Sequence, residues 1–222
     1  MNNKTILFIL LSIGVIFIIY KTDKYYKKKK KILLIKNPKI KEIDNISNVY
    51  MDIKIKNKIS RIEIQLFDDN VPKTARNFRF LCKQGLNGGN SPYIGTKFFR
   101  VIKDYIIQGG DIESNNGSGG YSIYGKYFDD ECFDLQHNQQ GLIAMVNKEK
   151  NKNNSQFMIL TKKNGVKSFN NRYVVFGIIL KGYNIINDIQ NVKVNDKYKP
   201  LNSIKIVDCG IITKEEDITL SI

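Results

Sequence analysis

Two neighbouring segments place charged and amide side chains beside apolar ones. Residues 98–102 read FFRVI, and residues 105–111 read YIIQGGD. If both segments are β-strands, side chains two residues apart share a face, so Arg100 lies beside Ile102 and Gln108 beside Ile106. The runs MVN at 145–147 and NSQFM at 154–158 repeat this mixture of amides and apolar side chains. The pattern therefore places a cation and an amide next to an apolar surface, where they could act on a polar group of a ligand.

Other common catalytic groups have little support in this sequence. His137 is the only histidine and has no credible serine or cysteine partner for a hydrolytic triad, so we expect a loop histidine. The three cysteines are too few for a disulfide framework and lack zinc-site spacing. The run GSGG at 117–120 is not followed by the lysine of a phosphate loop. The sequence therefore predicts neither a metal nor another cofactor.

Apolar alternation predicts the strands that would position these groups. Residues 49–55 and 61–66 alternate apolar and polar side chains on either side of a turn at 56–58, which predicts a hairpin with one buried face. Further short strand-like runs, broken by Gly and Asn, are found at 98–102, 105–108, 142–146, 157–160, 174–179 and 204–207. We expect the acidic run at 129–131 to be solvated.

Two helices complete the predicted elements. Pro72 precedes apolar residues spaced three or four apart, which indicates a helix start, and Gly85 is a plausible stop. A short helix is predicted at 183–189. Many short strands with few helices favour an all-β fold, either a closed barrel or a sandwich. The chain of 222 residues suffices for one such domain, and its aromatic content excludes a wholly disordered chain.

The amino-terminal segment has a different composition. Residues 5–20 carry no charge and would span about 24 Å as a helix, slightly less than a hydrocarbon core of ~30 Å. No small residues follow for a signal-peptide cut, and a soluble core helix would not be apolar on all sides. We expect a single transmembrane helix with a basic flank over residues 1–31, followed by a linker over 32–47.

The distribution of charge predicts which side of the membrane the domain occupies. The net charge is +15, and residues 1–47 hold 11 Lys against 3 acidic residues. Most of these lysines follow the apolar run, which places the bulk of the chain in the cytosol. The alternative is the secretory pathway, where the sequons at Asn45, Asn116 and Asn153 would become glycan sites. The charge does not indicate a nucleic-acid partner, because no aromatic–basic interleaving of the RNA-recognition type is present.

Residues 48–213 resemble the cyclophilin family of peptidyl-prolyl isomerases, with residues 214–222 as a tail. The matching stretches follow the family order: VPKTARNF (71–78), FFRVIKDYIIQGGD (98–111), NGSGGYSIYG (116–125), GLIAMVN (141–147), NSQFMI (154–159), VVFG (174–177) and DCG (208–210). The resemblance implies a closed eight-stranded antiparallel barrel capped by two helices. It also implies a monomer that isomerises X–Pro bonds in proline-containing segments of client proteins.

The resemblance also implies roles for individual residues. Arg100 would donate to the twisted amide, and Gln108 would hold the peptide carbonyl and steady Arg100. Asn147 would pair with the substrate backbone. The substrate would also contact a set of largely apolar side chains, namely Tyr105, Ile106, Phe157, Met158, Phe169 and Tyr173.

The rim of the implied site departs from the family pattern. Phe99 replaces a His next to Arg100, Met158 replaces a pocket aromatic, and Lys148 adds charge where the family has a small residue. The family Trp is missing, and Ser168 lies nearest to its place, which predicts weak cyclosporin binding. The alternative to an isomerase is a membrane-tethered module that binds proline-containing peptides with weak or no isomerase activity.

Overall fold

The computed structural model describes residues 48–85, 87 and 89–212, and these lie within one compact unit. The predicted transmembrane helix and the linker fall outside the described residues. Among the residues that the structure does describe, there is no helix with the length and apolar character needed to cross a membrane.

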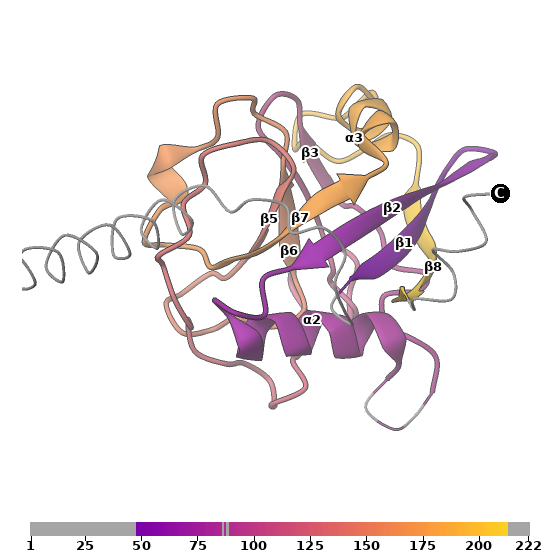
Figure 1. The fold of residues 1–222 in the computed structure, drawn as a ribbon. Coiled ribbons are helices and arrows are strands. Elements are labelled where there is room, and N and C mark those ends of the chain that lie inside the picture. Colours follow the sequence, from indigo (N-terminus) through magenta and orange to yellow (C-terminus); the bar gives the residue numbers. More distant parts are fainter. Residues whose placement is uncertain (1–47, 86, 88, 213–222) are drawn as a thin grey trace, which may run out of the picture. The chain divides into compact units, whose positions relative to one another are not determined.

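Eight antiparallel strands form one curled sheet, which confirms the predicted all-β class (Figure 1). Their order in the sheet is β3-β4-β6-β5-β7-β2-β1-β8. The strands are β1 (Val49–Ile55), β2 (Lys58–Leu66), β3 (Arg100–Ile102), β4 (Ile106–Gly109), β5 (Leu142–Met145), β6 (Phe157–Leu160), β7 (Val175–Lys181) and β8 (Ile204–Ile211).

Backbone hydrogen bonds link the β8 edge of the sheet to the segment that leads into β3. The N–H groups of Gly95 and Phe98 donate to the C=O groups of Ile206 and Ile204, at 2.7 and 3.0 Å. The N–H of Ile206 donates in return to the C=O of Thr96, at 3.0 Å. The sheet therefore curls far enough for its first and last strands to come together through residues 95–98.

Helix α2 (Pro72–Lys83) begins where the sequence predicted, with Pro72 in its first turn. The carboxylate of Glu131 accepts hydrogen bonds from the N–H groups of Lys73 and Thr74, at 2.9 and 2.7 Å. An anion is favourable there because the first N–H groups of a helix have no partner within the helix. The prediction that the acidic run at 129–131 is merely solvated is therefore wrong for Glu131.

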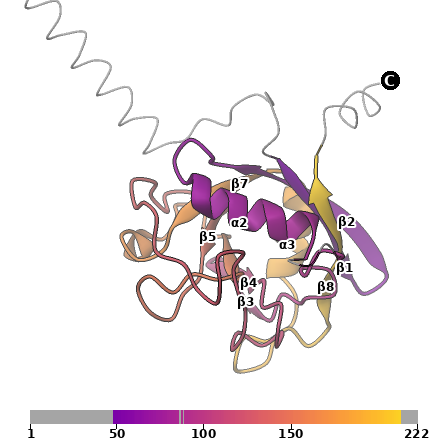
Figure 2. The same cartoon turned by 90° about the horizontal axis from the view of Figure 1, so that it is seen from below.

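The two helices lie at opposite ends of the curled sheet in Figure 1, and Figure 2 looks along that direction, with α2 towards the viewer. Helix α3 (Tyr183–Gln190) packs against β2, β3 and β4, whereas α2 packs against β1, β7 and β8. The face of α2 that includes Ala75, Phe78 and Leu81 is buried. Each helix thus covers one end of the strands, in agreement with the predicted capping.

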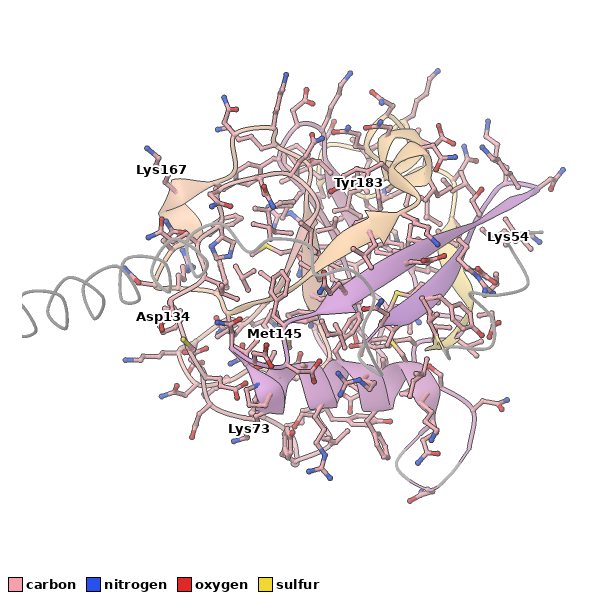
Figure 3. All side chains as sticks on the ribbon, viewed as in Figure 1. Lys54, Lys73, Asp134, Met145, Lys167 and Tyr183 are labelled. Atoms are coloured by element: carbon pink, nitrogen blue, oxygen red, sulfur yellow. The ribbon has the colours of Figure 1, made fainter. Side chains whose placement is uncertain are left out.

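An aromatic cluster fills the core between the sheet and α2. The ring of Phe78 lies 5.2 Å from that of Phe157, 4.9 Å from Phe176 and 5.4 Å from Tyr93, measured between centroids. The side chain of Met145 also lies in this interior (Figure 3). Burial of aromatic side chains of this size dominates the energetics of a small core.

Candidate active site

The strand register brings four side chains into one row across the sheet. Arg100 pairs with Gln108, Gln108 with Met158, and Met158 with Ala144, across β3, β4, β6 and β5. Residues paired directly across antiparallel strands project from the same face. The residues between them along the strands, Val101, Ile107, Ile159 and Ile143, make the opposite row and are buried in the core. The first row therefore lies on the outer face of the sheet.

A second row on the outer face continues the apolar surface. Ile102 pairs with Ile106, and Ile106 pairs with Leu160. Ile106 is 5% exposed and Met158 only 1% exposed, whereas Arg100 is exposed. Because neighbouring residues cover both Ile106 and Met158 almost completely, a ligand ring can pack against them only if some of these neighbours move. The predicted combination of a cation, an amide and apolar surface is thus present on one face.

Phe157 lies elsewhere, and its prediction as a wall of the proline pocket is wrong. Its ring is 0% exposed and makes edge contacts with Phe78, Tyr93 and Phe98 in the core. The physical reason is strand geometry, because Phe157 and Met158 are consecutive on β6 and must project from opposite faces. Of these two residues, only Met158 belongs to the row with Arg100 and Gln108.

Two of the predicted aromatic residues contact a third, Phe169, which lies in the 3-10 helix η1 (Lys167–Phe169). The ring of Phe169 lies 5.3 Å from that of Tyr105 and 5.2 Å from that of Tyr173. The N–H of Thr161 donates to the C=O of Tyr105 at 3.0 Å, which ties the β3–β4 turn to the end of β6. Tyr105, Phe169 and Tyr173 therefore form a second aromatic group, separate from the one in the core, and Tyr105 precedes Ile106 in the chain.

Asn147 follows β5 and its side chain is engaged by the protein. The Nδ2 group of Asn147 donates to the carboxylate of Asp130 at 3.1 Å and to Oδ1 of Asn153 at 3.2 Å. Its side-chain amide hydrogens are therefore committed to neighbours rather than to a ligand. Within the described ranges, its main-chain N–H and C=O make no hydrogen bond.

Arg100 makes a cation–π contact that sequence reasoning missed. Its guanidinium carbon lies 5.9 Å from the centroid of the Tyr198 ring. Tyr198 is held beside β3 because its C=O accepts the N–H of Val101 at 2.9 Å. An exposed cation–π contact contributes about 0.5–1 kcal/mol, so it restrains Arg100 without fixing it. No local pattern could have indicated this contact, because Tyr198 lies in a loop far from Arg100 in the sequence.

Gln156 is the second residue that sequence reasoning left without a role. Its Oε1 accepts a hydrogen bond from Nε2 of Gln108 at 3.1 Å. Both side chains are largely buried, at 5% and 8% exposure. The signal was present in the amide-rich run at 154–158. Within the described part of the chain no hydrogen bond joins Gln108 to Arg100, although the two are cross-strand partners.

His137 is buried beside Phe169, a member of the second aromatic group. Its ring packs edge-on against Phe169 at 5.7 Å, and its Nδ1 lies 3.1 Å from Oδ1 of Asn170. Burial disfavours the charged imidazolium and lowers the pKa of His137 from 6.5 to about 4, and the hydrogen bond to Asn170 only partly opposes this. The residue is a loop histidine, as predicted, and is neutral at physiological pH.

The depressed pKa of His137 predicts a loss of stability in mild acid. Below the unfolded value of 6.5 the unfolded chain binds the proton more readily, and the loss continues until the pH falls through the folded value of about 4. Between about pH 7 and pH 5, we expect this group to cost about 1–2 kcal/mol of the free energy of unfolding. Urea unfolding of the wild type and of His137→Gln at both pH values measures this cost as the difference between their pH dependences. Equal pH dependence in both proteins would contradict the assignment.

Comparison with known proteins agrees with this geometry. A family described as cyclophilin type peptidyl-prolyl cis-trans isomerase/CLD matches residues 50–211. The Caenorhabditis elegans peptidyl-prolyl cis-trans isomerase 9 is 44% identical over 174 residues, covering 76% of this chain and 56% of that protein. The human NK-tumor recognition protein is 41% identical, covering 73% of this chain and 11% of that protein.

A fly protein matches over more of its own length. The rhodopsin-specific isozyme of peptidyl-prolyl cis-trans isomerase from Calliphora vicina is 38% identical over 170 residues, covering 76% of this chain and 71% of that protein. This chain spans only about half the length of the Caenorhabditis relatives that it matches. The family match at 50–211 covers all eight strands of the described sheet apart from the first residue of β1, and the chain therefore belongs to the cyclophilin-type peptidyl-prolyl cis-trans isomerase family.

Proposed function

We propose that this chain catalyses cis–trans isomerisation of X–Pro bonds in segments of client proteins, as a monomer and without a cofactor. The observation that carries the proposal is the row that Arg100, Gln108 and Met158 form on the outer face of the sheet. A cation, an amide and an apolar surface in that order match a proline residue and its preceding peptide bond.

The reaction requires no proton transfer and no covalent intermediate. Rotation about the X–Pro bond breaks amide resonance, with a barrier of about 18–20 kcal/mol. As the bond twists, the lone pair becomes localised on the proline nitrogen, which then accepts a hydrogen bond well. The exposed guanidinium of Arg100 supplies a charged donor for this twisted state. The pKa of the neutral His137 is therefore irrelevant to the chemistry.

The neighbouring residues would bind and orient the peptide. The proline ring packs against Ile106 and Met158, with Tyr105, Phe169 and Tyr173 at the edge. Gln108 holds the peptide carbonyl through the second hydrogen of its Nε2 group, because the first is donated to Gln156. The unpaired main-chain groups of Asn147 pair with the peptide backbone. Catalysis then comes from interactions that strengthen as the bond twists.

The domain boundaries belong to the same proposal. We assign residues 48–213 to the catalytic domain, with the eight strands closed into a barrel. The hydrogen bonds between residues 95–98 and β8 support this closure. Residues 1–31, 32–47 and 214–222 are the anchor with its basic flank, the linker and the tail.

The second candidate is a binding module with weak or no turnover. It is favoured by the covered state of Ile106 and Met158, which a ligand must open. A protease-coupled assay on a proline-containing peptide separates the two candidates. An isomerase shortens the slow phase in proportion to enzyme concentration, whereas a binding module leaves its rate unchanged at low concentrations of protein.

Cyclosporin-type ligands are expected to bind weakly because Ser168 replaces the family tryptophan. Ser168 is exposed in η1 and offers neither an indole N–H nor an aromatic surface. We expect binding about thirtyfold weaker than in the variant Ser168→Trp, as measured by titration calorimetry. Equal affinity in the two proteins would show that this position does not contact the ligand.

Residues 5–20 are proposed to anchor the chain in a membrane, with the domain in the cytosol. The support is the uncharged run and the lysines that follow it. The full chain should resist carbonate extraction from membranes, and deletion of residues 1–31 should release it. A glycosidase-sensitive shift in gel mobility would contradict the cytosolic side. Extraction of the full chain by carbonate would contradict the anchor.

A further inference from the structure

The carboxylate of Asp111 organises the glycine-rich loop that follows β4. Its side chain is 0% exposed and accepts five backbone N–H groups. The donors are Glu113 at 3.2 Å, Ser114 at 2.9 Å, Asn116 at 3.1 Å, Gly117 at 2.8 Å and Gly119 at 3.2 Å. Burial alone would raise the pKa of Asp111, but these N–H groups outweigh burial and lower it. The carboxylate is therefore a charged centre around which residues 112–119 are wrapped.

The glycines of the run at 117–120 are required by this close wrapping. A side chain at Gly119 would place its Cβ 2.8 Å from Oδ1 of Asp111. Gly117 adopts a positive φ of +91°, which most side chains disfavour, and a Cβ there would lie 2.9 Å from the Phe99 ring. The run is thus neither a phosphate loop nor a simple spacer but a shell around a buried anion.

The same two glycines connect Asp111 to the candidate active site. Gly117 and Gly119 donate their N–H groups to Oδ2 of Asp111 and present their C=O groups to Gln156. The Nε2 group of Gln156 donates to these two carbonyls at 3.1 and 2.7 Å. Because a carbonyl cannot donate, the Gln156 amide cannot rotate by half a turn without losing both bonds. The loop therefore fixes which way the Gln156 amide faces.

The fixed amide of Gln156 in turn orients Gln108. Oε1 of Gln156 can only accept, so it requires the Nε2 group of Gln108 as donor, at 3.1 Å. Oε1 of Gln108 is then left as an acceptor without a partner in the described part of the chain. The side chain of Gln108 lies on the same face of the sheet as that of Arg100. An acceptor there suits a guanidinium, whereas the reversed amide would present a donor to it.

We propose that Asp111 is a positioning residue for the isomerase reaction, acting through the 117–119 loop and Gln156 to hold the Gln108 amide with its oxygen toward Arg100. This inference rests on the proposed function for its effect on rate. The orientation of Gln108 is a separate consequence that can be measured without turnover.

The variant Asp111→Asn tests the inference. Its side chain keeps the size of Asp but brings an NH₂ group against backbone N–H donors, which disturbs the loop carbonyls. We expect kcat/KM to fall about tenfold, because the expected loss of transition-state stabilisation is similar to the free energy of one charge-assisted hydrogen bond. The matched control is Asp134→Asn, which makes the same chemical change at an exposed position (Figure 3) and should leave kcat/KM unchanged. Unchanged kcat/KM in Asp111→Asn would overturn the inference.

A double-mutant cycle separates positioning from a general loss of structure. If Asp111 acts through Gln108, Asp111→Asn should add less than about twofold to the loss already caused by Gln108→Ala. Fully additive losses would overturn the inference in favour of a purely structural role. Melting of all variants by circular dichroism confirms that the rates refer to folded protein.

A spectroscopic readout keeps this inference distinguishable from the proposed function. The side-chain NH₂ resonances of Gln108 and Gln156 in a ¹H–¹⁵N correlation spectrum report their hydrogen bonds directly. Both should shift in Asp111→Asn and neither in Asp134→Asn, even if the wild type turns over no peptide. If the wild type is inactive but these shifts occur, the proposed isomerase function is contradicted, and the proposal that Asp111 orients Gln108 is supported. If the wild type is active but the Gln108 resonances do not shift in Asp111→Asn, the proposal that Asp111 orients Gln108 is overturned.

Discussion

Replacing Arg100 with Ala is expected to lower kcat/KM by at least about 100-fold, equivalent to ~2.7 kcal/mol of transition-state stabilisation. The reason is that Arg100 supplies the one charged donor that the described outer row contains. The side chain is exposed, and its guanidinium carbon lies 5.9 Å from the centroid of the Tyr198 ring. Its loss should therefore leave the free energy of unfolding within about 0.5 kcal/mol of the wild type. The protease-coupled assay and urea unfolding measure the two effects.

Two further variants define what the Arg100 result means. Arg76→Ala removes an exposed arginine from α2, away from the site, and should change neither quantity. Arg100→Lys keeps the charge but loses the planar fork of donors, so an intermediate loss of kcat/KM is expected. Wild-type activity in Arg100→Ala, with unchanged melting, would remove Arg100 from the mechanism.

Replacing Phe157 with Ala is expected to cost about 3–5 kcal/mol of the free energy of unfolding. The ring is 0% exposed and touches Phe78, Tyr93 and Phe98, so its removal leaves a cavity that rigid neighbours cannot fill. The loss would be a large share of the stability of an average domain. Denaturant unfolding, with the midpoint compared at constant slope, measures it.

The neighbouring position provides the matched control for Phe157. Met158→Leu conserves volume and should cost less than about 1.5 kcal/mol of stability. It should nevertheless change kcat/KM or peptide preference, because Met158 faces the outer row with Arg100 and Gln108. An unchanged unfolding midpoint for Phe157→Ala would mean that the ring does not occupy the core.

The contrast between Phe157 and Met158 shows where sequence patterns fail. The hairpin of β1 and β2 was predicted at its observed position because one of its faces is buried and the other is solvated. Apolar and polar residues therefore alternate along both strands. Strand β6 is buried on both faces, so FMIL carries no alternation. Its register was therefore ambiguous by one residue, and such a slip exchanges the two faces.

Contacts between segments far apart in the sequence could not be predicted, for a different reason. The runs that contain Arg100 and Gln108 were predicted to be strands, and the structure pairs them directly. The links from Asp111 to Gln156 and from Arg100 to Tyr198 join segments far apart in sequence. No local sequence pattern encodes them, because each depends on how the strands are arranged in the sheet. The role of Glu131 at the start of α2 was hidden in the same way.

The most direct test of the central claim is exchange spectroscopy on a proline-containing peptide mixed with a small amount of the full chain in detergent. Uncatalysed isomerisation takes tens to hundreds of seconds at 25 °C, too slow to give exchange cross-peaks. We predict strong cross-peaks between the cis and trans resonances with the wild type and their loss with Arg100→Ala. Peptide resonances that shift on binding but show no cross-peaks would contradict the isomerase and leave only a binding module.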